Sequence, residues 1–465
     1  TGGAYIMIYV LYNPFAGNKT CEEQSRKLTG LYKDEQLTFR SMADISYPEF
    51  FAGLKGEDRV IICGGDGTLN RFVNDARGID IHNDILYYAA GSGNDFLRDI
   101  GKEKGCDPFV INQYIKELPS VTVNGKETLF LNAIGFGIDG YCCEVGDELR
   151  KKSNGKPVNY TSIAIKGLLY AFKPTDATVI VDGVEKRYKK VWIAPTMNGR
   201  FYGGGMIAAP DQRRDAPDGK FSVVVWHGSN KLKTLVVFPS IFKGEHVKHS
   251  ECIDIIKADE VTVRFDKPCA LQIDGETILN VTEYSAKSSA RVKAEKLRSL
   301  NEERKDMTEK EAAKAIDMVE NTELINDNVL VVYLPECHES VAGIIAGRVK
   351  EYFYRPTFVI TDAAEGAKGS GRSIEGYNMF EEITRCGYLL NKFGGHPMAA
   401  GISLDKENID EFRWQLNHNQ KLTKEQLTPV TWIDVPMPLG YAGFPLIEQL
   451  KLLEPFGKGN EKPVF

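Results

Sequence analysis

No apolar run in this 465-residue sequence approaches the roughly 18–20 residues that are needed to cross a bilayer. The stretch Tyr5–Tyr12 has only strand length and no basic region before it, which argues against a secretory signal peptide. The nine cysteines are scattered without a CxxC pair or metal-ligand spacing, and the seven histidines are equally dispersed. These absences predict a protein of the reducing cytoplasm with free thiols and no structural zinc.

A strong charge of either sign is also missing. The net charge of -6 and the pI near 5.8 exclude a protein that coats nucleic acid over its whole surface, although a local basic face is compatible with them. The length predicts two to four domains. Because the chain starts at Thr1 and stops at Phe465 within an apparently unfinished domain, we expect both ends to be cut.

Apolar β-rich runs alternate with helical stretches over the first third of the chain. The runs Tyr5–Tyr12, Arg59–Cys63 and Ile85–Ala90 each end in a turn rich in Gly or Asn, and each turn precedes a helical segment. This order is typical of βα units around a parallel sheet. From about Val121 to Val281, short strands separated by Gly, Pro and Asp turns predict an antiparallel sandwich, interrupted by two helices.

The composition changes near residue 285. The segment Ser285–Ala315 is charged and free of Pro and Gly, which predicts a long exposed helix that joins two modules. A second α/β unit is expected over Asn328–Leu404, and Pro429–Phe465 resumes a β-like pattern.

The three Gly- or Asn-rich turns of the first third are candidate phosphate-binding loops. Glycines after a strand let the backbone approach a ligand, and the following helix offers unpaired N–H groups to phosphate. One such turn is more often structural, but three in one domain favour phosphate binding. No GxxxxGK[ST] motif and no dinucleotide fingerprint occurs, which excludes the P-loop class and weakens a dinucleotide fold. The turns are Asn13-Pro14-Phe15-Ala16-Gly17, Gly64-Gly65-Asp66-Gly67-Thr68 and Gly91-Ser92-Gly93-Asn94-Asp95.

Six motifs in order over about residues 7–285 resemble the diacylglycerol kinase catalytic family of soluble bacterial lipid kinases. They are NPFAG, GGDGTLN, GSGNDF, YGGGM, APDGKFSV and QIDGE. The resemblance implies an ATP site between two lobes. Its expected ligands are Asn13, Pro14, Gly17, Gly64, Gly65, Gly67, Thr68, Gly91, Ser92, Gly93 and Asn94.

The same resemblance assigns the catalytic roles. It implies that Glu276 accepts the proton of the lipid hydroxyl. The residue types of the glycine turns add Asp66 and Asp95, whose hard oxygen ligands are expected in reach of the Mg²⁺ that accompanies ATP. The resemblance also implies a structural Mg²⁺ held by Asp215, Asp218 and the backbone carbonyl of Lys220.

Simpler interpretations stand beside these roles. Asp274-Gly275 is a common hairpin turn, which would make Glu276 an ordinary residue after a turn. Asp215 and Asp218 can be turn residues beside Pro217 and Gly219. The NAD kinase group shares the GGDGT element, but the GSGNDF and DGE elements favour a lipid kinase. The basic and apolar segment Lys231–Lys248 either lies on an anionic bilayer or packs on the sandwich as an ordinary amphipathic helix.

From about residue 291 the sequence resembles a different family, the RecJ single-strand-specific exonucleases. The motifs are LRSLNEERKDM, HESVAGI, KGSGRS, GGHPMAAG and LEPFGKGN, the last of which resembles the start of an OB-type domain. The match covers the connecting helix and the DHH-associated domain, so Lys368, Arg372 and His396 are expected anion contacts. His396 is equally well explained as a structural residue. Nothing matches the nuclease metal site of that family, so we expect no cleavage of nucleic acid.

These observations predict an α/β plus β-sandwich two-lobed lipid kinase fold, a long linker helix and a small α/β domain with a truncated OB-type segment. The expected parts are a nucleotide-binding lobe (1–120), a lipid-substrate lobe (121–285), a linker helix (286–322), a RecJ-like domain (323–422) and the OB-type segment (423–465). The junction can be natural, engineered or a composite.

The predicted function is transfer of the γ-phosphoryl group of MgATP to a lipid hydroxyl at the membrane surface, with diacylglycerol as the expected acceptor. We expect cytoplasmic localisation with peripheral membrane contact. The sequence leaves open whether the protein forms a homo-oligomer. The alternative is a protein that binds nucleic acid or acts in DNA repair, contacts single strands through its C-terminal module and only senses nucleotide through its kinase-like domain.

Overall fold

The computed structural model describes residues 6–16, 20–33, 35–91, 94–152, 160–457 and 459–465. The chain divides into two compact units, Thr1–Leu297 and Arg298–Phe465, and each is described by itself. Within the described residues, no helix combines the length and the apolar character that a membrane span requires.

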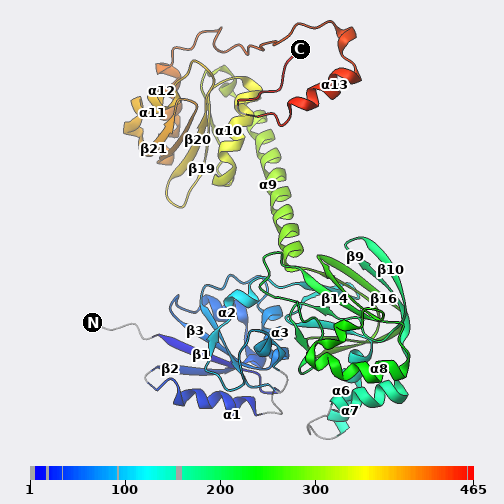
Figure 1. Ribbon diagram of the computed structural model, residues 1–465. Helices are drawn as coiled ribbons and strands as arrows, with labels where there is room; N and C mark the ends of the chain where they lie inside the picture. The colour runs from blue at the N-terminus through cyan, green and yellow to red at the C-terminus, as the bar shows by residue number, and fades with distance from the viewer. Residues whose placement is uncertain (1–5, 17–19, 34, 92–93, 153–159, 458) are drawn as a thin grey trace. The chain divides into compact units, whose positions relative to one another are not determined.

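A five-stranded sheet forms the first lobe of the first unit (Figure 1). Its strand order is β2-β1-β3-β4-β5; the first four strands are parallel and β5 is antiparallel to β4. The βα order expected from the sequence is therefore confirmed. The strands are β1 (Met7–Tyr12), β2 (Gln36–Ser41), β3 (Arg59–Gly64), β4 (Asp84–Ala89) and β5 (Phe109–Val110). The helices are α1 (Cys21–Arg26), α2 (Tyr47–Ala52), α3 (Asp66–Asp75), α4 (Asp95–Asp99) and α5 (Asn112–Ile115).

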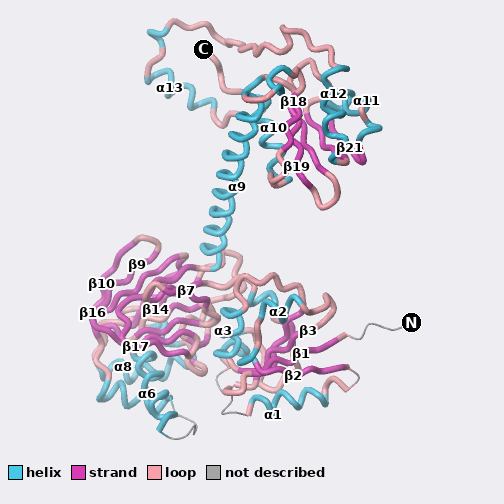
Figure 2. The backbone as a smooth tube through the Cα atoms, turned by 180° about the vertical axis from the view of Figure 1, so that it is seen from behind, coloured by secondary structure: helices cyan, strands magenta, loops and turns pink. Residues whose placement is uncertain are grey.

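The second lobe is an antiparallel ten-stranded sheet, which confirms the expected change of pattern (Figure 2). Strand β16 (Glu260–Ile273) bends at register shifts between Arg264 and Leu271, so its first part pairs with β9 and its last part with β8. The other strands are β6 (Ser120–Val123), β7 (Lys126–Leu129), β8 (Ala133–Phe136), β9 (Thr175–Val181), β10 (Val184–Val191), β11 (Thr196–Met197), β14 (Phe221–Trp226), β15 (Ile253–Ala258) and β17 (Glu276–Lys287).

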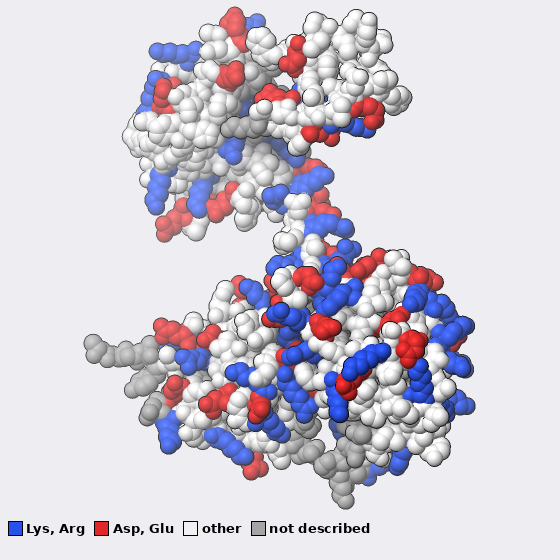
Figure 3. All heavy atoms as spheres, in the orientation of Figure 1, with Lys and Arg blue, Asp and Glu red and all other residues white. Residues whose placement is uncertain are grey.

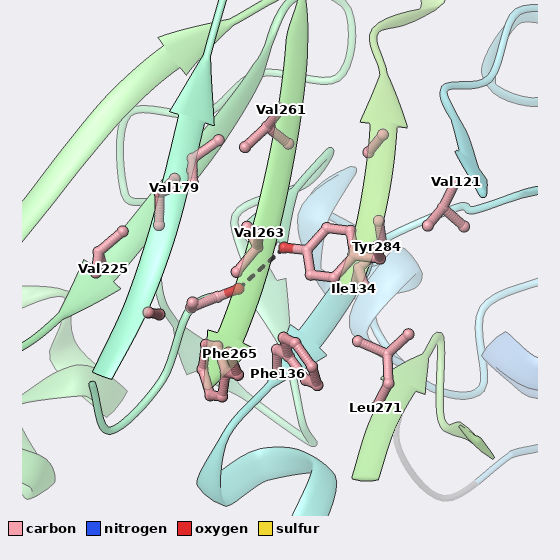
Figure 4. Packing of buried hydrophobic residues seen from close by; sticks show 14 of the residues in the cluster. Val121, Ile134, Phe136, Val179, Val225, Val261, Val263, Phe265, Leu271 and Tyr284 are labelled. Atoms are coloured by element: carbon pink, nitrogen blue, oxygen red, sulfur yellow. Dashed lines mark hydrogen bonds between the residues drawn. The ribbon is translucent and has the colours of Figure 1, made fainter. Parts of the chain in front are cut away.

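The bent sheet encloses a core of alternating apolar side chains. Val179, Val263 and Phe136 come from three different strands and pack in one cluster (Figure 4). The hydroxyl of Tyr284 is satisfied inside this cluster, because it lies 2.9 Å from the Thr196 hydroxyl and donates to the Ala194 carbonyl at 3.0 Å. The buried Tyr284 hydroxyl is therefore hydrogen-bonded, as buried polar groups usually are.

Several helices and one small hairpin accompany the sandwich. Helix α6 (Ile138–Lys152) contacts β16 and β17, and α7 (Tyr160–Lys166) continues into the π-helical turn η4 (Gly167–Ala171). Helix α8 (Lys231–Val237) is followed by the 3-10 helix η5 (Phe238–Lys243). The hairpin consists of β12 (Phe201–Tyr202) and β13 (Met206–Ile207). The two helical segments expected within the sandwich are thus present.

Helix α9 (Ser289–Glu320) confirms the expected long helix. Its first half is exposed, as expected, but Ala312, Ala315 and Val319 are buried against the second unit. That unit holds the sheet β18-β19-β20-β22-β21, in which only the β18–β19 pair is parallel. The strands are β18 (Leu330–Tyr333), β19 (Thr357–Asp362), β20 (Ala367–Arg372), β21 (Leu390–His396) and β22 (Ala399–Leu404), and the main helices are α10 (Glu339–Phe353), α11 (Met379–Arg385) and α12 (Ile409–Asn419).

The β-like pattern expected for 429–465 is wrong for the residues that the structure describes there. They form α13 (Phe444–Leu450) and short 3-10 turns, with one isolated bridge between Gly457 and Asn460 in place of a strand. Large apolar side chains such as Leu439 and Phe444 are 89% and 85% exposed. A strand pattern needs a partner strand and a core to cover it, and this segment packs against neither.

Candidate functional site

The candidate phosphate-binding turns lie at one edge of the first sheet. In the parallel register Tyr12 pairs with Cys63, and Gly64 pairs with Ala89, so the turns after β1, β3 and β4 follow neighbouring strand ends. The Asn13 amide donates to the Thr68 hydroxyl at 3.3 Å, which joins the first two turns. The three motifs are therefore assembled at the carboxyl edge, where open α/β sheets bind ligands.

The second and third turns touch through their backbones. A Cβ on Gly91 would overlap the Cα of Gly65, and a Cβ on Gly64 would lie 2.5 Å from the Thr68 side chain. The amides of Ala90 and Gly91 both donate to the Gly64 carbonyl, at 2.8 and 3.2 Å. Glycine is needed here for close approach, because any side chain would separate the two loops.

The two acidic residues of these turns have different surroundings. Asp66 accepts hydrogen bonds from the amides of Asp95 (2.7 Å) and Phe96 (3.3 Å), and it therefore caps the start of α4. Asp95 accepts from the Gly204 amide at 2.8 Å, while its Oδ1 is buried and has no hydrogen-bond partner among the described residues. Burial and the nearby Asp66 charge raise the pKa of Asp95 to about 7. The Arg98 guanidinium lies 3.7 Å from Oδ1 of Asp95 and partly offsets the negative charge of this pair.

Glu276 reaches the same edge from the second lobe. Asp274 (φ 47°) and Gly275 (φ 94°) form the two-residue turn between β16 and β17, and Glu276 is the first residue after it. A Cβ on Gly67 would lie 3.7 Å from Oε1 of Glu276, so the carboxylate stands beside the first turn of α3. The hairpin-turn interpretation and the catalytic interpretation of this motif are therefore compatible.

Asp274 fixes the position of that turn, a role that the sequence did not reveal. Its carboxylate accepts from the Asn70 amide at 2.6 Å and from the backbone amides of Leu131, Asn132 and Ala133 at 2.5, 2.7 and 3.0 Å. Asn70 belongs to α3, so a single buried carboxylate ties α3 to the sandwich and holds Glu276 near it. Charged groups with several hydrogen bonds make strong contacts of this kind.

Asp99 and Arg214 form a second connection between the lobes. The Arg214 guanidinium donates to Asp99 at 2.5 Å and to the Asn132 side chain at 2.9 Å, and both charged side chains are almost fully buried. The Arg200 backbone amide and guanidinium also donate to Asp99, at 2.9 and 3.1 Å. Neither Asp99 nor Arg214 lies in one of the motifs quoted from the sequence.

The expected structural metal residues lie on an exposed loop. The Arg213 guanidinium holds both oxygens of Asp215 at 3.2 Å and keeps the pKa of that carboxyl below its usual range. Asp218 accepts from the Lys220 amide at 3.3 Å, and the Lys220 carbonyl accepts from Gln212 at 2.9 Å. In the described part of the chain, no three His, Cys, Asp or Glu side chains group as metal ligands. The turn interpretation accounts for these contacts, and a metal here stays a prediction.

Three of the expected ATP ligands lie outside the described residues, and a lysine beside the third turn was not expected from the sequence. Gly17, Ser92 and Gly93 lie outside the described residues. Asn94 adopts a left-handed conformation and donates to the Gly91 carbonyl at 2.9 Å, and Pro14 lies in the turn after β1. The Lys104 ammonium donates to the same carbonyl at 3.1 Å, which adds a positive charge beside the third turn. An isolated lysine outside any motif gave no signal in the sequence.

The second unit contains a groove of about 490 Å³ between the start of α10 and the sheet. Lys368 and Lys392 line it and lie in one row, because both pair with Ser403 in the sheet register. Phe393 also lines the groove and is 40% exposed. Lys368 was an anion contact expected from the sequence, whereas Lys392 and Phe393 lie outside the quoted motifs. The Lys368 ammonium pairs with Glu339, which also lines the groove, at 2.7 Å.

The other two expected anion contacts of this unit lie elsewhere. The Arg372 guanidinium donates to the Gly371 carbonyl at 2.8 Å and lies against Gly343 of α10. Nδ1 of His396 accepts from the Met398 amide at 3.3 Å at the end of β21. Neither side chain lines the groove, so the three expected contacts are not assembled in one cavity.

Comparison with known families gives three successive matches. Residues 7–121 match the diacylglycerol kinase catalytic domain, residues 132–292 match the YegS C-terminal NAD kinase beta sandwich-like domain, and residues 326–421 match the DHHA1 domain. The RecJ single-stranded-DNA-specific exonuclease of Bacillus subtilis is 37% identical over 257 residues, which cover 52% of this chain and 32% of that protein. A diacylglycerol kinase of Mycobacterium tuberculosis is 29% identical over 204 residues, which cover 42% of this chain and 64% of that protein.

The chain thus spans about a third of the RecJ protein and just under two thirds of the kinase. A crystal structure of a diacylglycerol kinase from Bacillus anthracis superposes with a TM-score of 0.42 at 19% identity, over 62% of this chain and 96% of that chain. The family resemblances expected from the motifs are confirmed. The chain carries a diacylglycerol-kinase-like catalytic domain with its β-sandwich partner, followed by a RecJ-like DHHA1 domain.

Proposed function

We propose that the first unit is an ATP-dependent lipid kinase that phosphorylates diacylglycerol to phosphatidic acid. The observation that carries this proposal is the position of Glu276 beside Gly67, at the edge where three glycine turns meet. A phosphate-binding edge and a carboxylate base are the two elements that transfer of a phosphoryl group to an alcohol requires.

The residues of this chain can perform the transfer. Backbone amides at the start of α3, which has no side-chain cap, and the Lys104 ammonium would hold the triphosphate, since helix starts and cations favour anions. The Glu276 carboxylate would accept the hydroxyl proton while the lipid oxygen forms its bond to the γ-phosphorus. The bond from the γ-phosphorus to the β,γ-bridging oxygen then breaks, and ADP leaves.

The acidic pair fits a hard divalent cation. Oδ1 of Asp95 is buried and makes no hydrogen bond among the described residues, although the Arg98 guanidinium lies 3.7 Å away. Burial and the adjacent Asp66 charge disfavour ionisation of Asp95. Bound Mg²⁺ would neutralise the phosphate oxygens and favour the ionised form of both carboxylates. Asp66 would keep its second role at the start of α4.

The test compares Glu276→Gln with wild type in diacylglycerol micelles and labelled ATP. We expect the turnover to fall by about 10²- to 10⁴-fold, the usual contribution of general base catalysis. Glu283→Gln is the matched control, because Glu283 lies on the same strand, is exposed and pairs with Arg264. Equal turnover of Glu276→Gln and wild type would remove the base assignment.

Parallel assays with sphingosine and NAD as acceptors decide the substrate, and phosphorylation of NAD alone would overturn the lipid proposal.

We propose, second, that the groove of the second unit binds single-stranded nucleic acid. It is supported by Lys392 and Phe393, since a cation beside the backbone and an aromatic ring for base stacking are typical of such sites. Lys368 lines the same groove, but its ammonium is paired with Glu339 at 2.7 Å. Lys392→Ala is expected to weaken binding of oligo-dT and to reduce its salt dependence. Lys421→Ala, a change of one exposed lysine outside the groove, is the control. A Kd for oligo-dT that is the same in both variants would contradict this assignment.

A further inference from the structure

The sandwich lobe exposes an apolar surface on two neighbouring helical segments, α7–η4 and α8–η5. The segments are in contact, and the Lys231 ammonium donates to the Leu169 carbonyl at 3.3 Å. Tyr170, Leu232 and Val236 are 79%, 73% and 73% exposed. We name this the docking surface; its apolar members are Ile165, Leu169, Tyr170, Leu232, Val236 and Phe242.

The docking surface is separate from the packing face of the same helices. Thr234, Val237 and Ile241 are buried in the second core cluster or against it, and they hold α8–η5 to the lobe. Leu232 and Val236 are four residues apart and therefore share the opposite face of α8. The expected amphipathic packing of this segment is present, but it leaves a second apolar face exposed to solvent. Exposed apolar faces of this kind mark sites of interaction with a protein or a membrane.

Unpaired positive charges accompany the apolar side chains. Lys166, Lys173, Lys231 and Lys243 belong to the same segments or adjoin them, and none forms an ion pair with a carboxylate that the structure describes. The lysines that do pair, Lys233 with Glu251 and Lys248 with Glu245, neutralise the acidic groups nearby. In Figure 3 the surface over α8 is mainly white with blue side chains near it. Exposed apolar groups together with unpaired lysines suit the interface of an anionic bilayer.

We propose that this docking surface seats the first unit on an anionic lipid bilayer and so brings the site to its lipid. The proposal rests on the proposed lipid kinase function. The link to the site is α6, which contacts α7 on one side and β17 on the other. The Asp147 carboxylate of α6 accepts from the hydroxyl of Thr277 at 2.9 Å, and Thr277 is the residue after Glu276. The docking surface and the base are thus attached to the same helix.

The experiment measures sedimentation of the full chain with phosphatidylcholine vesicles that contain or lack phosphatidylglycerol. Wild type is expected to bind the anionic vesicles and to lose binding at high salt. Lys231→Gln/Lys243→Gln should lower the affinity by roughly 20- to 30-fold, since each lysine near the surface contributes about a fivefold effect. Leu232→Glu/Val236→Glu should abolish binding to the same vesicles.

Matched controls come from the same lobe and its hairpins. Val184 lies in the β9–β10 hairpin and is 72% exposed, so Val184→Glu adds one carboxylate at a similar exposure. Lys126→Gln/Lys190→Gln removes two exposed lysines from other hairpin positions. Both controls should bind vesicles like wild type. Equal loss in the controls, or full binding of the docking-surface variants, would overturn the proposal.

Turnover separates this proposal from the kinase proposal. With a water-soluble short-chain diacylglycerol, the docking-surface variants should match wild type, while their turnover on vesicle-borne diacylglycerol falls with binding. If wild type binds vesicles through this surface but phosphorylates neither substrate, the kinase proposal fails and the docking proposal stands. If Leu232→Glu/Val236→Glu instead changes the oligomeric state in gel filtration and leaves vesicle binding intact, the surface is a contact between copies and the docking proposal fails.

Discussion

Replacing Asp139 with asparagine is expected to stabilise the first unit at neutral pH. Asp139 lies at the start of α6, and neither of its buried carboxyl oxygens has a hydrogen-bond partner among the described residues. Burial raises the pKa of Asp139 to about 7, although the nearby Gly140 amide and Tyr202 hydroxyl partly oppose this shift. Ionisation of this group therefore opposes folding, because the unfolded chain ionises it in water with a pKa of about 3.9.

The sign and the size of the effect follow from these two pKa values. The pKa of Asp139 is higher in the folded state than in the unfolded state. The free energy of unfolding is therefore highest below about pH 4, where Asp139 is protonated in both states, and it falls as the pH rises through about 7. The two values differ by about three, and one pKa unit corresponds to about 1.4 kcal/mol, so the loss is at most about 4 kcal/mol. The asparagine side chain of the Asp139→Asn variant does not ionise, so its contribution to the free energy of unfolding does not change with pH. The stability difference between variant and wild type should thus grow from near zero at low pH to a few kcal/mol above neutrality.

Urea unfolding at pH 5 and pH 8 checks this expectation. The fluorescence of Trp192 and Trp226 reports on the first unit, because both are buried there, whereas Trp414 and Trp432 of the second unit are already 54% and 82% exposed. Glu148→Gln, at an exposed position of the same helix, controls for loss of a charge. A stability gain that is equal at both pH values would refute the argument from burial, and a lower stability of Asp139→Asn at pH 8 would show that the carboxylate has a stabilising partner.

Two further predictions concern contacts that position the candidate site. Asp274→Ala removes the acceptor of three buried backbone amides, while the Asn70 amide keeps the Leu129 carbonyl as a second acceptor. At about 1–3 kcal/mol for each unsatisfied group, with incomplete additivity, the free energy of unfolding should fall by about 4 kcal/mol, measured by urea unfolding. An unchanged unfolding midpoint would show that the carboxylate is dispensable. Gly91→Ala should abolish ATP binding in calorimetry without a large change in the melting temperature, because its Cβ separates the second and third turns. Gly56→Ala, where a Cβ meets nothing within 4 Å, should bind ATP like wild type, and equal binding by both variants would contradict the close-approach argument.

The central strands of the first sheet could be predicted from the sequence because they are buried on both faces. Arg59–Gly64 and Asp84–Ala89 are nearly continuous apolar runs followed by glycine turns, which is the pattern of parallel strands. Strand β2 was missed, since this edge strand is only partly buried and its alternation in QLTFRS rests on two apolar residues, Leu37 and Phe39. The segment 429–465 failed in the opposite way, because its apolar residues predicted strands that have no partner.

The site could be predicted only where its residues lie in motifs. The glycine turns and Glu276 are local patterns, and the family resemblance gave them roles. Asp274 and Asn70 are 204 residues apart, and Asp99 and Arg214 are 115 apart, so no local spacing connects them. The contacts that hold the two lobes in register depend on the tertiary fold, and a single sequence does not record them.

The turn at Asp274 and Gly275 shows why structural and catalytic interpretations of a motif need not compete. Both residues have positive φ, as the central positions of a type I′ hairpin require, and this conformation turns the Asp274 carboxylate toward the amides of 131–133. Because strand side chains alternate in direction, the register that this turn sets also decides which way Glu276 points. A one-residue slip would move Glu276 to the other face of β17. The buried aspartate therefore fixes the turn that places the exposed glutamate, two residues later, beside α3.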